Sequence, residues 1–178
     1  MDLEKHKALV KQKAKENKAF FKEIKRLKPK VLDQKMHELH QEVFACTNCL
    51  ECANCCSTTG PLFTDKDIGR IAKHLRMKPS EFNEKYLRID EDNDYVLQSV
   101  PCAFLGDDNR CSIYDVRPKA CREFPHTDRI KQHQLLNLTQ KNVAVCPAVY
   151  HIVEKMKKVQ KLNLFVDMGN GDYKATTP

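Results

Sequence analysis

Tryptophan is absent from this chain of 178 residues, and glycine occurs only five times. The sequence has no apolar run near the roughly 18 residues that a membrane-spanning helix needs. No apolar stretch of signal-peptide length follows Met1. We therefore expect a cytoplasmic protein without a membrane partner. Glycine-rich phosphate loops and the H-E-x-x-H motif are also missing, so neither pattern suggests a function.

The composition leaves a thin hydrophobic core. Hydrophobic residues make up 41% of the chain and charged residues 31%, and a core of this size would benefit from metal or disulfide bonds. Nine cysteines could supply them. In a reducing cytosol, cysteine clusters more often bind metal than form disulfides. An odd number of thiols would also leave one unpaired in a full disulfide framework, so we favour metal ligation.

Five of the cysteines lie in one short run, CTNCLECANCC, from Cys46 to Cys56. Gaps of two residues allow neighbouring sulfurs to converge on one centre, as in zinc sites and iron–sulfur clusters. Side chains of consecutive residues tend to point apart. We therefore expect Cys55 and Cys56 to serve different centres, unless only one is a ligand. The other four follow singly, at Cys102, Cys111, Cys121 and Cys146.

Positive charge is concentrated at the start of the chain. Residues 1–45 hold twelve Lys or Arg and seven Asp or Glu, a net +5, while the rest contributes +2 to the total of +7. Apolar residues at spacings of three, four or seven predict helices here, over 3–28 and 31–44. We interpret the lysines as a solvated face, with acidic partners or RNA as the alternative. Nucleic acid is not favoured because interleaved aromatic residues and glycine–arginine repeats are missing.

Beyond the cysteine run, the sequence predicts mostly helices. Residues suited to the N-cap, such as Thr64, or to the first helical position, such as Pro147, indicate where they begin. Helices are expected over 65–76, after Ser80 as a further N-cap, over 116–122 and over 147–161.

A β-hairpin is expected around the turn at 106–109, with Cys102 and Cys111 on the flanking strands. The polar residues 126–142 are expected to form a loop or an irregular strand pair. The predicted fold class is mainly α with a small β-hairpin, irregular around the cysteines. We divide the chain into a basic N-terminal helical extension over 1–45, a cysteine-cluster metal-binding domain over 46–162 and a C-terminal tail over 163–178.

The order of the cysteines resembles the YkgJ family, also called the CxxCxxCC family of zinc- or iron-chelating domains. The similarity covers about residues 46–150. It includes the run from Cys49 to Cys56, the block CSIYDVRP beginning at Cys111, and the block CREFP beginning at Cys121. Ala53 stands where the family usually has glycine.

This resemblance implies metal chelation but fixes neither the metal nor a reaction. Cys46 lies outside the family pattern, where it could substitute in a site, remain a free thiol or pack. The eight cysteines that match the pattern, and that we predict as metal ligands, are Cys49, Cys52, Cys55, Cys56, Cys102, Cys111, Cys121 and Cys146.

The metal remains open between a [4Fe-4S] iron–sulfur cluster and zinc. With zinc, eight thiolates would divide into two closed tetrahedral sites. With iron–sulfur, the start of the ferredoxin run C-x2-C-x2-C-x3-C-P recurs twice, at Cys46-Cys49-Cys52 and at Cys49-Cys52-Cys55, and the remote Cys146-Pro147 supplies its Cys-Pro element. We favour the cluster slightly, since zinc sites mostly use pairs of cysteines. The remaining set, Cys56, Cys102, Cys111 and Cys121, could form a second centre.

Three functions are compatible with these patterns. We place a metal-binding protein first, ahead of an iron–sulfur-dependent oxidoreductase or electron carrier and of a zinc-stabilised nucleic-acid-binding protein.

Two arginines flank Cys121. Arg117 and Arg122 either compensate thiolate charge or form salt bridges with Asp115 or Glu123. His126 is interpreted as a turn residue rather than a ligand. The sequence identifies no catalytic residue and no protein partner.

Overall fold

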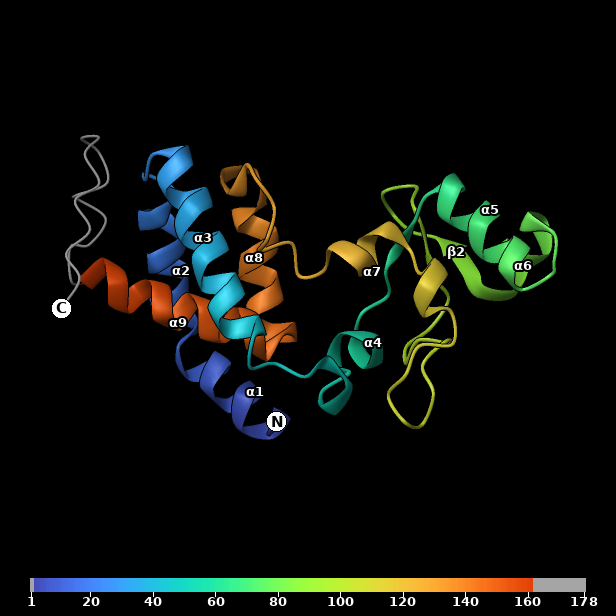
Figure 1. The fold of residues 1–178 in the computed structure, drawn as a ribbon, viewed down its shortest axis with the longest axis horizontal. Helices are drawn as coiled ribbons and strands as arrows, with labels where there is room; N and C mark the ends of the chain where they lie inside the picture. The colour runs from blue at the N-terminus through green and yellow to red at the C-terminus, as the bar shows by residue number, and fades with distance from the viewer. Residues whose placement is uncertain (1, 162–178) are drawn as a thin grey trace.

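The structure, a computed structural model, describes residues 2–161, so the tail predicted over 163–178 lies outside the described residues. Figure 1 shows two lobes, with α4 and α7 between them. No helix in the described part of the chain is both long and apolar enough to cross a membrane. The first lobe is helical and consists of α1 (Leu3–Gln12), α2 (Ala14–Ile24), α3 (Pro29–Phe44), α8 (Gln132–Val145) and α9 (Pro147–Lys161).

The helical lobe encloses a core built from both ends of the described chain. Leu32 and Met36 of α3 are fully buried with Ile152 and Met156 of α9. Each such side chain stabilises the fold by about 1.5–3 kcal/mol relative to an exposed one. The predicted helices over 31–44 and 147–161 are confirmed as α3 and α9. The first helices and the last helices therefore stabilise one another.

Two expectations for this lobe were wrong. The single helix expected over 3–28 is broken at Lys13, whose backbone leaves helical geometry. This break lets α1 pack against α8 and α9, where His6 is buried and its Nε2 lies 3.3 Å from the Ala144 carbonyl oxygen.

The loop or strand pair expected over 126–142 is instead largely α8. Its apolar periodicity is hidden because much of its buried face is polar. Gln132 and Asn142 are buried, and their side-chain amides donate to the carbonyls of His126 (2.9 Å) and Pro125 (3.2 Å). Hydrogen bonding, which a hydrophobicity pattern does not register, stabilises this helix in the interior.

The second lobe contains a three-stranded antiparallel sheet in the order β1-β3-β2, which confirms the fold class as mainly α with a small β-hairpin. Phe63, Phe82 and Phe104 meet in its core, and the rings of Phe82 and Phe104 stack with 6.2 Å between centroids. The strands and the two helices of this lobe are β1 (Leu62–Phe63), β2 (Leu87–Ile89), β3 (Tyr95–Leu97), α5 (Asp65–His74) and α6 (Pro79–Tyr86).

The hairpin lies elsewhere than expected, between β2 and β3. The turn predicted at 106–109 does form. The segments on either side of it pair only through an isolated bridge between Leu105 and Cys111 and do not make strands. Pro101 has no N–H to donate to a ladder, which limits strand pairing before the turn. Cys102 and Cys111 therefore lie on an extended loop rather than on strands.

Two helix starts also differ from expectation. Helix α6 begins at Pro79 with Lys78 as N-cap, two positions before Ser80, which was expected to be the cap. The helix expected over 116–122 is divided into a 3-10 turn, η2 (Tyr114–Val116), and α7 (Lys119–Glu123). Pro118 explains the division, because a proline disfavours helical geometry in the residue before it.

Helix α5 starts as predicted, with Thr64 as N-cap and a reciprocal capping box formed with Asp67. The Asp67 side chain is only 2% exposed. It also accepts hydrogen bonds from Arg70 Nη2 (2.5 Å) and from the backbone N–H of Lys119 (3.1 Å). This carboxylate thereby joins the start of α5 to the start of α7.

We expect Asp67→Asn to lower the free energy of unfolding by about 2 kcal/mol at pH 7, because charge-assisted hydrogen bonds are removed. Asp65→Asn in the exposed first turn of α5 is the matched control and should cost far less. Urea unfolding measures both. Equal destabilisation of the two variants would contradict a special role for Asp67.

The contribution of Asp67 to stability should also depend on pH. Burial alone would raise the pKa of Asp67, but hydrogen bonds from Thr64 and Arg70 outweigh it and hold the pKa below its ordinary value. The stabilisation is therefore complete above the unfolded pKa of about 3.9 and is lost as the pH falls through the folded pKa. The stability difference between wild type and Asp67→Asn should shrink below about pH 4. A constant difference would contradict this assignment.

Candidate metal centre

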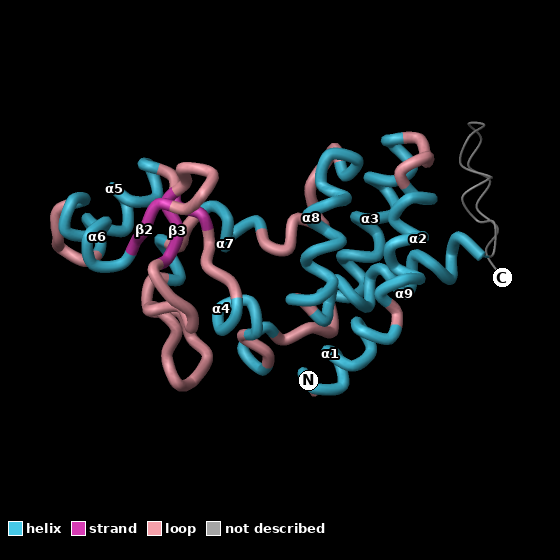
Figure 2. The backbone as a smooth tube through the Cα atoms, turned by 180° about the vertical axis from the view of Figure 1, so that it is seen from behind, coloured by secondary structure: helices cyan, strands magenta, loops and turns pink. Residues whose placement is uncertain are grey.

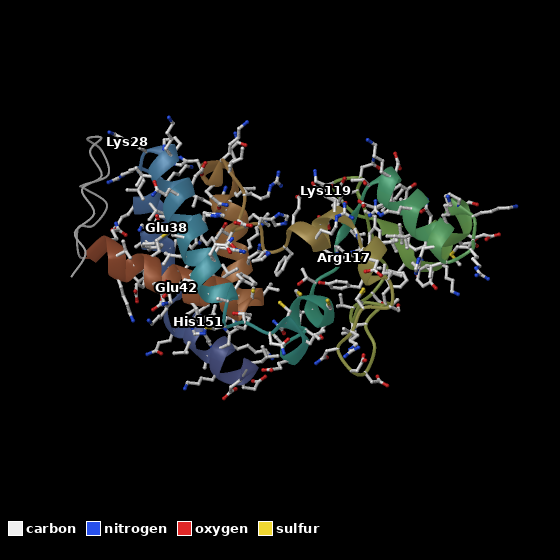
Figure 3. All side chains as sticks on the ribbon, viewed as in Figure 1. Lys28, Glu38, Glu42, Arg117, Lys119 and His151 are labelled. Carbon is white, nitrogen blue, oxygen red and sulfur yellow. The ribbon has the colours of Figure 1, made fainter. Side chains whose placement is uncertain are left out.

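The cysteine run lies between the two lobes. It follows α3 and forms a 3-10 turn, η1 (Cys49–Glu51), and the short helix α4 (Asn54–Thr58). Figure 2 shows this segment on the path from the helical lobe to the sheet. Sulfur atoms, yellow in Figure 3, gather around α4. The chain therefore presents its thiols where the lobes approach each other.

The turn between Cys49 and Cys52 is tight. The backbone N–H groups of Cys52 and Ala53 both donate to the Cys49 carbonyl, at 3.1 and 2.9 Å. Ala53 adopts left-handed geometry with φ 42°, a conformation that is unfavourable for a residue with a Cβ atom and favours glycine. Glycine, which the CxxCxxCC family usually has at this position, adopts this conformation without strain.

Four cysteines line one cavity of about 60 Å³. They are Cys49, Cys52, Cys55 and Cys146, which we call the first group. The volume of this cavity exceeds the roughly 10–15 Å³ that a single water molecule needs. Its other walls are mostly apolar, with Phe44, Phe124 and Ala148 among them.

Cys146 reaches this cavity through the bend between α8 and α9. It ends α8, where its N–H donates to the Asn142 carbonyl (2.8 Å), and Pro147 then opens α9. Asn54, buried in α4, donates from Nδ2 to the Val145 carbonyl at 2.6 Å. This hydrogen bond fixes α4 against the bend, so the local cysteine run and the remote thiol meet. Sequence patterns gave no signal for Asn54, because a polar residue between cysteines is also typical of a solvent-exposed turn.

The second group consists of the other family cysteines, Cys56, Cys102, Cys111 and Cys121. The Cys102 N–H donates to the Cys56 carbonyl at 2.8 Å, which joins α4 to the extended loop. Burial, followed by the nearby charges of the other three thiols, raises the pKa of Cys121 in α7 to about 12. Cys121 therefore lies close enough to the other three cysteines of this group to interact with them electrostatically.

Cys55 and Cys56 connect the two groups. Their sulfur atoms are 3.9 Å apart, so these adjacent side chains do not point apart as expected. A hydrogen bond from Cys56 lowers the pKa of Cys55, and the same hydrogen bond raises the pKa of Cys56. Cys49 and Cys146 of the first group raise the pKa of Cys55. Cys56 raises the pKa of Cys102 and Cys111 in the second group, and also that of Cys49 in the first.

The thiols are neighbours rather than a closed coordination sphere. Within residues 2–161, no three Cys, His, Asp or Glu side chains lie close enough together to hold one metal ion. Burial raises the pKa of Cys49 and raises that of Cys146 to about 11. Cys46 is exposed and does not line the cavity.

Arg117 lies beside the second group, at the position that Figure 3 labels. Its guanidinium stacks 3.8 Å from the centroid of the Tyr114 ring and donates from Nη1 to the Tyr114 carbonyl (2.6 Å). Its positive charge lowers the pKa of Cys111 and Cys121, against the larger effect of burial. Arg117 therefore can compensate negative charge on these thiols.

Arg122 and His126 have more ordinary contacts. Arg122 donates from Nη1 to the Arg117 carbonyl at 2.6 Å, and the described residues contain no ion pair between it and Asp115 or Glu123. His126 lies in a turn, with Nδ1 3.9 Å from Glu123 Oε2, and burial lowers its pKa.

Comparison with known proteins matches this chain to a protein family and to one relative. The CxxCxxCC model, described as "Putative zinc- or iron-chelating domain", matches residues 48–147. "Uncharacterized protein MJ0661" of Methanocaldococcus jannaschii is 33% identical over 93 residues. These residues cover 49% of this chain and 49% of the relative, so the chain spans about half the length of that protein. No solved structure matches.

Exposure predicts the order in which free thiols react. In reduced, metal-free protein at about pH 8, Cys46 should be alkylated by iodoacetamide at least tenfold faster than Cys121 or Cys146, which burial keeps protonated. Peptide mass spectrometry after a short pulse measures each site. Equal labelling of Cys46 and Cys146 would contradict the lower accessibility of Cys146.

Proposed function

Because this chain belongs to the CxxCxxCC family of zinc- or iron-chelating domains, we propose that it binds two metal centres through eight cysteines. The first group, Cys49, Cys52, Cys55 and Cys146, would hold one centre. The second group, Cys56, Cys102, Cys111 and Cys121, would hold the other. Metal binding would draw each set of sulfurs together and bind them as thiolates.

The observation that carries this proposal is the shared cavity. Cys146 is separated from Cys55 by 91 positions in the chain, yet both line the same cavity of about 60 Å³ with Cys49 and Cys52. Thiolates are the preferred ligands of zinc and of iron–sulfur clusters. A set of four thiols around an apolar cavity fits either of these centres chemically.

For the first group we favour a [4Fe-4S] cluster. Three of its cysteines have the two-residue gaps of the ferredoxin run, and the fourth is followed by proline. The mostly apolar walls of the cavity between them would limit access of water to a cluster. When bound, such a cluster supplies one-electron transfer, with a potential set by hydrogen bonding and solvent exposure.

The second group accommodates zinc or a second cluster equally well. Its four thiols come from α4, the extended loop and α7, so one centre would join three segments that contain little regular structure. Four thiolates around a zinc ion carry a net charge of −2, and Arg117 is placed to offset part of it. We assign no substrate and no catalytic residue.

Single serine variants test the proposal. Cys146→Ser should abolish the centre of the first group and remove the metal bound there, while Cys46→Ser should retain the wild-type metal content. Cys121→Ser should remove metal from the second group and lower the stability of the sheet lobe. Metal analysis and unfolding of anaerobically purified proteins measure these effects.

Two outcomes would contradict the proposal. Full metal content in Cys146→Ser would remove the remote cysteine from the first group. An equal decrease in metal content in Cys46→Ser and Cys146→Ser would show that the cavity does not define the ligand set.

A further inference from the structure

A second feature of the molecule lies away from the cysteines. Between residues 15 and 30 the chain carries seven basic residues and only two acidic ones, Glu16 and Glu23. All seven basic side chains are exposed. We call them the basic face; they are Lys15, Lys18 and Lys22 of α2, Lys25, Arg26 and Lys28 of the turn, and Lys30 at the start of α3.

The acidic residues that could neutralise this surface are directed elsewhere. Glu16 pairs with the buried Lys157 of α9 at 2.9 Å, and Glu23 accepts a hydrogen bond from Gln160 of α9, also at 2.9 Å. Within residues 2–161, no side chain of the basic face forms an ion pair. The positive charge of α2 is therefore left uncompensated.

The three lysines of α2 and its C-cap residue Lys25 share one side of the helix. Lys15, Lys18, Lys22 and Lys25 are separated by three or four residues, which places one cation on each turn, about 5 Å apart along the axis. Like charges at this spacing destabilise a helix by a few tenths of a kcal/mol per pair. The arrangement therefore adds nothing to the stability of the fold.

The apolar side of α2 limits the kinds of partner. Phe20, Phe21 and Ile24 are at most 5% exposed in the core of the helical lobe. An amphipathic helix binds a membrane by inserting its apolar face, and that face is not available here. The basic face also contains no aromatic residue on which an unpaired base could stack.

We propose that the basic face binds the phosphate backbone of duplex nucleic acid, without reading its sequence. A linear polyanion provides one charge for each lysine along the helix, and counterion release drives such binding. The basic turn lies one α3 length from the cysteine run, about 24 Å by helical rise. Figure 3 labels Lys28 at that remote end and Glu42 near the other. This inference does not depend on the metal centres.

A matched pair of fourfold variants tests the proposal. Lys15, Lys18, Lys22 and Lys25 are changed to Gln in one protein. In the control, four exposed cations of the sheet lobe are changed to Gln: Lys66, Lys73, Lys85 and Arg88. Both variants lose the same charge. Circular dichroism and metal content should match the wild type in each.

Anisotropy of a labelled duplex of roughly 20 base pairs, between about 50 and 200 mM salt, gives the affinity and its salt slope. We expect the α2 variant to bind at least tenfold more weakly near 50 mM, with a salt slope that is shallower by about 0.9 for each phosphate that is no longer neutralised. The control variant should bind within about twofold of the wild type. If the fourfold variant does not fold, the double variant Lys18→Gln, Lys22→Gln should show about half the change in slope.

Three results would overturn the proposal: no salt-dependent duplex binding by the wild type, equal weakening in both fourfold variants, or tighter binding to phosphatidylserine vesicles than to the duplex. The second result would show that affinity for the duplex depends on the net charge of the protein and not on the basic face. The third would identify an anionic membrane surface as the partner.

Discussion

Cysteines from four distant stretches of this chain lie near one another around α4, and the contacts of α4 with both lobes produce this arrangement. The Asn54 side chain holds α4 to the bend between α8 and α9, which brings Cys146 to the first group. On the other side, the hydrogen bond between the Cys102 N–H and the Cys56 carbonyl connects α4 to the loop of the second group. Each contact is local, but together they determine which cysteines become neighbours.

The two lobes have separate hydrophobic cores, and each contributes to a different group. Helices α8 and α9 of the helical lobe supply Cys146, while Phe104 and Ile113 of the sheet lobe anchor the loop that carries Cys102 and Cys111. A small core on each side leaves the region between them to be stabilised by other means. Metal–thiolate bonds at α4 would contribute folding energy in this region.

Sequence patterns predicted the elements that obey simple rules. The capping residue Thr64 and the helix-opening Pro147 both stand where expected. Patterns failed where tertiary contacts override them. Helix α8 was missed because Gln132 and Asn142 are buried through hydrogen bonds. The break at Lys13, which lets α1 pack against α8 and α9, coincides with no glycine or proline in the sequence.

The candidate site was partly predictable for the same reason. Spacing alone allows the ferredoxin-like run at either Cys46-Cys49-Cys52 or Cys49-Cys52-Cys55, and the cavity favours the second set because Cys55 lines it and Cys46 does not. What spacing cannot supply is the route of the chain: the bend that delivers Cys146, or the buried Asn54 that secures it. The 3.9 Å approach of the Cys55 and Cys56 sulfurs was also missed, because α4 orients adjacent side chains more closely than an extended segment would.

The most direct measurement of the central claim is the metal and sulfide content, with the absorption spectrum, of protein purified without oxygen. The account predicts broad absorption at about 400 nm, with about four irons and four sulfides per chain for the first group. Either zinc or further iron would then belong to the second group. Colourless protein that contains zinc alone would contradict the iron–sulfur assignment, and protein without bound metal would contradict the two-centre account as a whole.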